Sequence, residues 1–496
     1  MTYDLAIRGG MVVDGTGAPG RRADLAIDGD RIAVVGSPSG DARRTIDATG
    51  RVVAPGFIDV HSHDDFALLG RPACEAKVMQ GVTSVVIGNC GFGAAPLGPA
   101  YLGFLRSFGP TLFGPLGDPS WHTTDDFFRL LEREPPSVNV AALVPHATVR
   151  MAVLGGSKRE PNPSELEAMR DIVREAMQAG AVGMSTGLFY APGSYATTEE
   201  VIEVARVVGE GGGVYATHLR DEADGLLDSV AEALRIGEEA GVAVQLSHHK
   251  AMGERNWGMV ERSLAMIDAV RGRGADVTLD VYPYTSLSTT LVALRDAGVL
   301  ETVPPAAVWI ATMQTLHELE GKSLADVCMM WGATSAREAA DLLFERDGRG
   351  IIAIVAAMDE RDVRRVLAHP ATMIGSDGVP SVDGKPHPRL YGTFARVLQV
   401  YVREQGVLSL EEAVHRMTGL SARRFGLADR GMIAEGRHAD VVVFDPKTVA
   451  TQSTYEDPRQ YPVGMDAVVV NGDVVVDRGA HTGARAGRML RSRARA

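Results

Sequence analysis

The stretch that decides the fold is residues 55–65, PGFIDVHSHDD. An apolar run leads into two histidines that stand one residue apart, His61 and His63, and two carboxylates follow. Side chains two residues apart point the same way on a β-strand, so both imidazoles are expected to converge at the end of a strand. Convergent imidazoles next to carboxylates favour a metal centre over two ordinary loop histidines.

Outward from this stretch, apolar β-like runs alternate with helical segments, which predicts parallel βα units. Eight runs are the expected strands: Gly56–Val60, Thr83–Ile87, Val138–Val144, Ala181–Ser185, Val214–Thr217, Val242–Ser247, Val277–Val281 and Met373–Ser376. Eight strands predict an α/β protein with a (β/α)8 TIM-like barrel over residues 55–425. A ninth run, Ile351–Val355, is assigned to a lid-like insertion at about 285–350, between strands seven and eight.

Both ends of the chain show β patterns instead. Residues 1–54 read as short strands, with a hairpin signal at Asp28-Gly29, and residues 426–496 return to this pattern with another at Asn471-Gly472. We expect the two ends to form one small β-sandwich into which the barrel is inserted. The last residues make a basic tail, which is interpreted as a solvated terminus. It contains Arg485, Arg488, Arg491, Arg493 and Arg495.

Composition narrows the classes of function. The 496 residues are 45% hydrophobic and carry a net charge of −13, which argues against a nucleic-acid partner. No apolar run approaches the roughly 18–20 residues of a membrane span. The three cysteines are too few for a disulfide framework and no secretory signal is recognised, so a cytoplasmic protein is expected. The oligomeric state is left open.

Metal-ligand and acid–base residues stand at the predicted carboxyl ends of several strands, where barrel active sites lie. These residues are His61, His63, Cys90, His218, His248, His249, Lys250 and Asp377. One cysteine and two histidines with a vacant fourth position are typical of catalytic zinc. The other two cysteines, Cys74 and Cys328, are interpreted as ordinary thiols.

Longer motifs carry a family resemblance. PGFIDVHSHDD, GNCGFG, GMSTGLFYAPGSYATTEE, THLRDE, LSHHK, LDVYPYTSLSTTL, MIGSDG and HPRLYGTFARVL resemble the amidohydrolase superfamily and, within it, the N-acyl-D-amino-acid deacylases. The resemblance implies hydrolysis of a small N-acyl-D-amino acid. It implies a tight Zn²⁺ site at Cys90, His218 and His248. It also implies a second position, weakly filled or empty, lined by His61, His63 and Asp377. The carboxylated lysine of many amidohydrolases is absent after strand four, where residues 184–188 read MSTGL.

The same resemblance implies roles in catalysis and substrate binding. Asp377 is expected to move the proton, while Lys250, Tyr190 and Arg389 bind the substrate carboxylate and Ser288 adds a hydrogen bond. Arg295 is expected to meet an acidic side chain, which favours N-acyl-D-glutamate. His249 is interpreted as a packing or supporting residue, and His146 is equally compatible with a structural or a functional role.

Three alternatives stay open at this point. The first is a broad or hydrophobic-substrate D-aminoacylase, and the second is a cyclic-amide hydrolase, against which the missing strand-four lysine counts. The third is a catalytically silent scaffold, which the complete set of expected ligands disfavours.

Overall fold

The computed structural model describes residues 2–113, 119–381 and 383–492, and its centre is an eight-stranded parallel sheet. The sheet order is β18-β14-β13-β12-β11-β10-β9-β8. In chain order the strands are β8 (Phe57–Asp59), β9 (Val82–Ile87), β10 (Asn139–Pro145), β11 (Gly183–Gly187), β12 (Val214–His218), β13 (Ala243–Leu246), β14 (Val277–Val281) and β18 (Thr372–Ile374). Each predicted strand is present, so the barrel prediction is confirmed.

The barrel closes between its first and last strands, β8 and β18. An isolated parallel bridge joins Ser62 to Gly378 just beyond their ends. The Asp377 amide donates to the His61 carbonyl oxygen at 2.7 Å, and the His63 amide donates to the Gly378 carbonyl oxygen at 3.2 Å. Closure of the barrel therefore places His61 and His63 directly beside Asp377.

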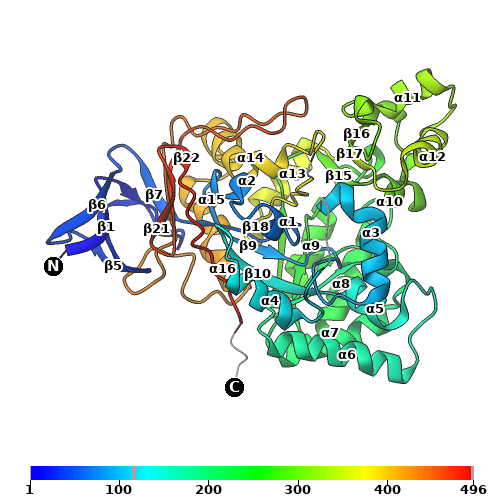
Figure 1. Ribbon diagram of the computed structural model, residues 1–496, viewed down its shortest axis with the longest axis horizontal. Helices are drawn as coiled ribbons and strands as arrows, with labels where there is room; N and C mark the ends of the chain where they lie inside the picture. The colour runs from blue at the N-terminus through cyan, green and yellow to red at the C-terminus, as the bar shows by residue number, and fades with distance from the viewer. Residues whose placement is uncertain (1, 114–118, 382, 493–496) are drawn as a thin grey trace.

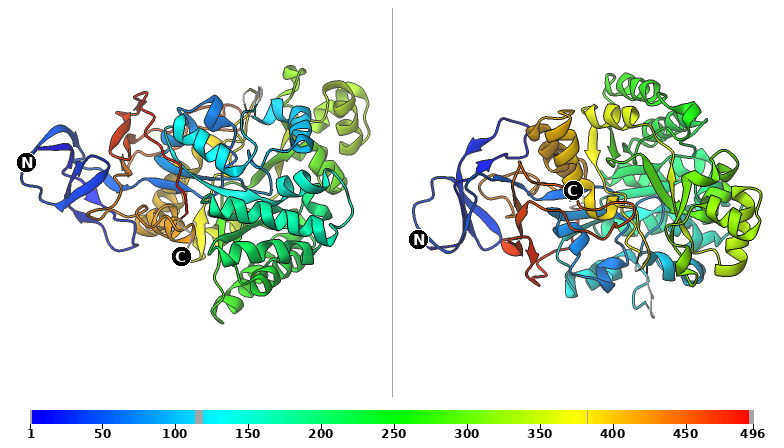
Figure 2. Two further views of the ribbon diagram at one scale, coloured as in Figure 1. Left: turned by 60° about the horizontal axis from the view of Figure 1, so that its bottom comes forward. Right: turned by 90° about the horizontal axis from the view of Figure 1, so that it is seen from above.

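Helices cover the outside of the barrel, as the cyan-to-green ribbons of Figure 2 show. They are α1 (Ala67–Gly70), α2 (Glu75–Val78), α3 (Pro99–Phe113), α4 (Thr124–Arg133), α5 (His146–Leu154), α6 (Pro163–Gln178), α7 (Thr198–Glu210), α8 (Leu226–Ala240), α9 (Val260–Arg271), α13 (Glu360–Ala368), α14 (Arg389–Arg396), α15 (Leu410–Met417) and α16 (Gly419–Arg424). Local sequence sets their limits: α6 begins at a capping box between Asn162 and Glu165, with Pro163 as its first residue. No helix in the described ranges combines the length and apolarity needed to cross a membrane.

The two chain ends form a β-sandwich at one end of the molecule (Figure 1). One sheet, β5-β4-β1-β6, is N-terminal and comprises β1 (Thr2–Arg8), β4 (Asp24–Asp28), β5 (Arg31–Gly36) and β6 (Asp41–Asp47). The other, β22-β21-β20-β19-β7-β2-β3, mixes both ends and comprises β2 (Met11–Val12), β3 (Arg21–Arg22), β7 (Val52–Pro55), β19 (Val441–Phe444), β20 (Met465–Val470), β21 (Asp473–Asp477) and β22 (Ala480–His481). Leu25 and Ile27 share one buried core with Val441 and Val443.

A separate unit lies between β14 and β18, at the opposite end of the molecule from the sandwich (Figure 1). It holds the sheet β15-β17-β16 and three helices: β15 (Ser286–Thr290), α10 (Leu291–Asp296), β16 (Val308–Thr312), α11 (Leu324–Trp331), α12 (Ala336–Asp347) and β17 (Ile352–Ala356). It has its own hydrophobic core. The ninth strand-like run is β17, so the insertion extends past residue 350. Its role as a lid stays a prediction.

The basic tail is docked, in contrast to the expectation of a solvated terminus. The Val140 amide in β10 donates to the Arg488 carbonyl at 2.9 Å, and the Leu490 amide donates to the Val140 carbonyl at 2.7 Å. Arg491 Nε lies 2.7 Å from Glu132 Oε1, and its Nη1 lies 2.6 Å from Asp125 Oδ1. These acidic partners on α4 explain the docking. Residues 493–496 lie outside the described residues.

Candidate metal centre and active site

Cys90, His218 and His248 are brought together at the carboxyl end of the barrel strands. The Cys90 Sγ atom lies 3.7 Å from His218 Nδ1 and 3.5 Å from His248 Nε2. All three residues are buried, with exposures of 6% or less. They come from the ends of β9, β12 and β13, and their candidate ligand atoms lie within 4.8 Å of one another.

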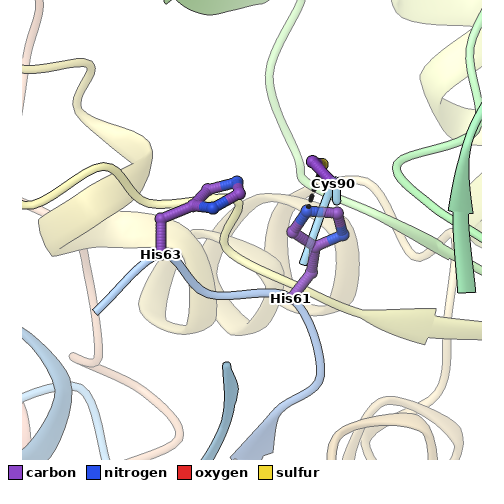
Figure 3. Close-up of side chains that lie close together, drawn as sticks. All are labelled: His61, His63 and Cys90. Atoms are coloured by element: carbon purple, nitrogen blue, oxygen red, sulfur yellow. Dashed lines mark hydrogen bonds between the residues drawn. The ribbon is translucent and has the colours of Figure 1, made fainter. Parts of the chain in front are cut away.

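His61 and His63 lie beside this group on the loop after β8. Figure 3 shows that the His61 ring points toward Cys90, with His63 next to it; His61 Nε2 lies 3.3 Å from the sulfur. Asp377 Oδ1 lies 3.5 Å from His61 Nε2 and 3.1 Å from His63 Nε2. The set His61, His248 and Asp377 is itself a compact group of candidate ligands. The structure thus brings the two predicted positions side by side.

The backbone is strained at the two exits that carry the cysteine and the aspartate, and at His248. Cys90 has φ 53°, His248 has φ 34° and Asp377 has φ 49°. Residues other than glycine seldom adopt this left-handed region, Asp and His more often than Cys, and each such residue costs about 1–3 kcal/mol. Non-glycine residues with positive φ are six in the described ranges, so half of them lie in this one cluster. Such clustering of strain is typical of functional sites.

Electrostatics favour the ionised form of the cysteine. Burial opposes ionisation, but His61, His218 and His248 hold the pKa of the Cys90 thiol well below its usual range. Burial likewise opposes ionisation of Asp377, yet Arg389 and the imidazoles hold the pKa of its carboxyl well below the ordinary value. The Cys90 thiolate therefore lies beside His218 and His248, and the Asp377 carboxylate lies beside His61 and His63.

This donor chemistry fits a zinc ion. A thiolate and two imidazoles are zinc ligands, and a site with three protein ligands keeps a position open for chemistry. Strand four supplies support in place of a ligand: the Ser185 hydroxyl accepts from the Gly91 amide at 3.0 Å and donates to the Gly88 carbonyl. Ser185 thereby fixes the loop that carries Cys90.

A pocket opens next to the cluster and contains several predicted substrate residues. Tyr190, Lys250 and Ser288 line it together with His218, His248 and Asp377. The Tyr190 hydroxyl lies 3.1 Å from Thr289 Oγ1, so residues of the insertion form one wall. Four more lining residues are apolar: Phe189, Met252, Leu287 and Leu294.

Arg389 stands at the boundary between the pocket and the cluster. Its Nη1 lies 2.9 Å from Asp377 Oδ2, and its Nη2 donates to the Ser288 carbonyl at 3.1 Å. The guanidinium also covers the ring of Tyr282, 4.5 Å from the ring centroid. Two buried donors at this point, Arg389 Nε and the Tyr282 hydroxyl, have no hydrogen-bond acceptor among the described residues. Unsatisfied buried donors cost free energy, so both suit an anionic ligand.

Arg295 is not part of the site, which corrects the expectation that it meets an acidic side chain. It lies on α10 with Nη2 3.0 Å from Asp341 Oδ1 and Nη1 2.9 Å from Asp296 Oδ1. Its neighbour Leu294 faces the pocket instead. Consecutive residues point about 100° apart on a helix, so the two cannot share one face. The ion pair with Asp341 on α12 therefore holds Arg295 outside the pocket.

Two histidines of uncertain role have structural surroundings. The His249 Nε2 atom lies 2.7 Å from Ser263 Oγ on α9, so this ring packs behind β13. His146 Nε2 lies 3.1 Å from Glu200 Oε1, and both residues are fully buried between α5 and α7. Neither imidazole belongs to the compact ligand groups.

Sequence reasoning missed two residues of the site. Tyr282 follows β14 within the LDVYPYTSLSTTL motif, and Glu222 ends the THLRDE motif four residues after His218. Glu222 is buried, and its Oε1 accepts from Lys250 Nζ at 2.7 Å. The signal that could have found both is their place just beyond strands that deliver other site residues.

Comparisons with known proteins agree with this geometry. The Amidohydrolase family profile matches residues 44–285 and 324–476. D-aminoacylase from Alcaligenes xylosoxydans xylosoxydans is 45% identical over 98% of this chain and 97% of its own length, and N-acyl-D-glutamate deacylase from the same organism is 44% identical over 98% and 96%. The crystal structure of N-acyl-D-glutamate deacylase from Bordetella bronchiseptica, complexed with zinc and a phosphonate inhibitor, superimposes with a TM-score of 0.91 at 43% identity, covering 99% of this chain and 100% of that one. The chain therefore belongs to the amidohydrolase family, in its N-acyl-D-amino-acid deacylase branch.

Proposed function

We propose that this protein is a zinc-dependent hydrolase that cleaves N-acyl-D-amino acids into a carboxylate and a free D-amino acid. The observation that carries the proposal is the contact of a thiolate–imidazole cluster with Asp377, which in turn touches Arg389 beside the pocket. The relatives named above act on substrates of this class. The tight zinc position is assigned to Cys90, His218 and His248, and the second position to His61, His63 and Asp377.

The chain's own residues divide the reaction between them. Zinc, when bound, supplies a Lewis acid that polarises the amide carbonyl. Asp377 accepts a proton from the attacking water and returns it to the departing amine nitrogen. The His63 imidazole and the Arg389 guanidinium hold this carboxylate from two sides, at 3.1 and 2.9 Å. Their contacts fix the direction in which Asp377 receives the proton.

The substrate carboxylate is assigned to the donors beside the pocket. Arg389 Nε and the Tyr282 hydroxyl are buried donors in need of an acceptor, and Lys250 adds a positive charge within the pocket wall. Tyr190 and Ser288 stand on the same pocket wall. The preference for a D substrate is supported by the relatives.

The side chain of the substrate is proposed to be apolar. Phe189, Met252 and Leu294 line the pocket, while Arg295 is turned away and paired with acids. The cations near the pocket, Lys250 and Arg389, are assigned to the α-carboxylate of the substrate, which leaves neither of them for a carboxylate on its side chain. An acidic side chain would meet apolar carbon there, so N-acyl-D-leucine or N-acyl-D-methionine is favoured over N-acyl-D-glutamate.

The proposal is tested by amine release from N-acetyl-D-leucine, N-acetyl-L-leucine, N-acetyl-D-glutamate and a hydantoin, with metal analysis of the same sample. We expect one tightly held zinc per chain and the highest rate of amine release with N-acetyl-D-leucine. Hydrolysis of the hydantoin alone would favour the cyclic-amide alternative. A protein that holds no zinc and hydrolyses none of the four compounds would contradict the proposed enzymatic function. A cytoplasmic location is also proposed, supported by the three free cysteines.

A further inference from the structure

One buried carboxylate lies behind both histidines of the tight metal position. Glu222 Oε2 lies 3.6 Å from His218 Nε2, and Glu222 Oε1 lies 3.0 Å from His248 Nδ1. The opposite nitrogens of these rings, His218 Nδ1 and His248 Nε2, are the ones that face Cys90 Sγ. Each oxygen of the carboxylate thus faces the outer nitrogen of one ring.

His218 faces the cysteine with Nδ1, whereas His248 faces it with Nε2. The nitrogen on the far side of the ring, called the outer nitrogen below, is therefore Nε2 in His218 and Nδ1 in His248. A neutral histidine that binds a metal through one nitrogen carries its proton on the other. Metal-binding histidines usually donate that outer N–H to a carboxylate or carbonyl, which fixes the tautomer and the ring plane. For His218 the outer donor is Nε2 and for His248 it is Nδ1, and Glu222 lies beside both.

Lys250 completes the arrangement. Its Nζ lies 2.7 Å from Glu222 Oε1, 3.0 Å from the His248 carbonyl oxygen and 2.8 Å from His248 Nδ1. An ammonium group has no acceptor, so it competes for His248 Nδ1 only when that atom is unprotonated. A metal bound at Nε2 would leave the proton of the neutral ring on Nδ1. Lys250 then donates to Glu222 and to the carbonyl, and balances the buried negative charge.

The loop that carries Glu222 is held in place by its own contacts. The Glu222 carbonyl accepts from the Met252 amide at 2.7 Å, which ties the loops after β12 and β13 together. Asp221 accepts from the Ala223 amide at 2.6 Å and from the Gly225 amide at 3.1 Å. Glu222 is 4% exposed. Its carboxylate is therefore fixed independently of the rings it faces.

We propose that Glu222 is the positioning residue of the metal centre: one carboxylate that sets the tautomer and the orientation of both His218 and His248. The inference rests on the proposed function, because it requires a metal at Cys90, His218 and His248. It assigns Glu222 no contact with the reacting atoms. It also gives Lys250 a second task besides substrate binding, namely to keep Glu222 charged and oriented within the barrel mouth.

The test compares zinc affinity in the wild type and in Glu222→Gln, by competition with a chelator, and records the visible spectrum of the Co²⁺-substituted proteins. The amide has the shape of the carboxylate but accepts with one oxygen only, so one outer N–H loses its partner. We expect zinc to bind about 10–100-fold more weakly and the Co²⁺ bands to shift. Asp224→Asn, which makes the same chemical change at an exposed acid of the same loop, should leave both unchanged.

Glu222→Asp provides a second variant, which keeps the charge but withdraws it by one methylene. Thermal unfolding of the metal-free proteins separates loss of fold from loss of metal. Unchanged zinc affinity and unchanged Co²⁺ spectra in both folded Glu222 variants would overturn this inference alone. A wild-type protein that binds no zinc would overturn the proposed function, and this inference with it.

Discussion

The guanidinium of Arg389 lies 2.9 Å from the carboxylate of Asp377, so the candidate carboxylate anchor and the candidate proton acceptor touch each other. A substrate carboxylate that binds Arg389 competes for the same cation. Because Arg389 contributes to the low pKa of Asp377, we expect that sharing it with a substrate would raise that pKa and make Asp377 a stronger base. Substrate binding and proton transfer are then expected to be coupled through one side chain.

Asp377→Asn is expected to lower kcat by at least about 10²–10⁴-fold, the usual range for general acid–base catalysis. The amide preserves the shape of the side chain but cannot take the proton. Zinc content at the cysteine site should stay near that of the wild type, as measured on the same sample. A variant that kept most of its kcat would place the proton acceptor elsewhere.

Cys90→Ala is expected to remove the tightly held zinc and with it the activity, because the thiolate is the one sulfur ligand of the cluster. His63→Ala is the matched comparison, since His63 contacts Asp377 and lies beside the second position. It should lower turnover more than zinc content. Metal analysis after dialysis, with turnover of N-acetyl-D-leucine, separates the two. Full zinc content in Cys90→Ala would refute the assignment.

Leu294→Arg is expected to shift the preference from N-acetyl-D-leucine toward N-acetyl-D-glutamate, because it replaces an apolar pocket wall with a cation. Losing an apolar contact in such a pocket changes kcat/KM by about 10–200-fold. Arg295→Leu is the control and should leave the ratio of the two substrates unchanged. If Arg295→Leu abolished turnover of a preferred glutamate substrate, the corrected position of Arg295 would be wrong.

Much of the barrel and of the candidate site can be predicted from the sequence. The barrel strands were predictable because a parallel strand buried on both faces reads as a largely apolar run, as in residues 140–144. His61, Cys90 and Asp377 were predictable because each follows such a run. Their meeting at one rim is a consequence of barrel geometry.

The residues that sequence reasoning missed or misplaced depend on contacts between distant segments. Glu222 stands in a loop with three acidic residues in six, and only the fold shows which one faces the histidines. Arg295 was misplaced because its partner Asp341 lies 46 positions away on another helix. The tail was misread because its acidic partners on α4 lie more than 300 positions earlier.

His249 is expected to make stability depend on pH. Burial lowers the pKa of this imidazole from 6.5 to about 4. The unfolded chain takes up the proton near pH 6.5 while the folded chain stays neutral, so the free energy of unfolding falls as the pH drops from about 6.5 to about 4. The contribution is fully present above pH 6.5 and is worth roughly 3 kcal/mol.

The measurement is denaturant unfolding of metal-free wild type and His249→Gln between pH 4 and 8. Glutamine keeps a donor toward Ser263 but does not titrate, so the variant should lose less stability over that interval. Equal pH dependence in both proteins would show that His249 is not the responsible group.

Gly487→Ala is expected to destabilise the protein more than Arg491→Ala does. A Cβ atom at Gly487 would lie 2.0 Å from the Val138 carbonyl oxygen, so the tail would have to leave β10. Arg491 is partly exposed, and each such ion pair is worth about 0.2–1 kcal/mol. Thermal unfolding gives the order. The activity per folded molecule should be unchanged in both variants, because the tail docks near the start of β10, far from the strand ends that hold the metal site.

The sheet shared by the two chain ends has a consequence for how the protein is made. β7 pairs with β19, and Arg51 contacts Asp466, a residue 415 positions later in the chain. The N-terminal sheet β5-β4-β1-β6 can pair within itself, but β7 lacks its partner β19, and the sandwich core lacks Val441 and Val443, until nearly the whole chain has been synthesised. Domains usually fold as units during synthesis, from the N-terminus onward. Here the N-terminal sheet has no complete facing sheet until then, so completion of the sandwich becomes a late step of folding.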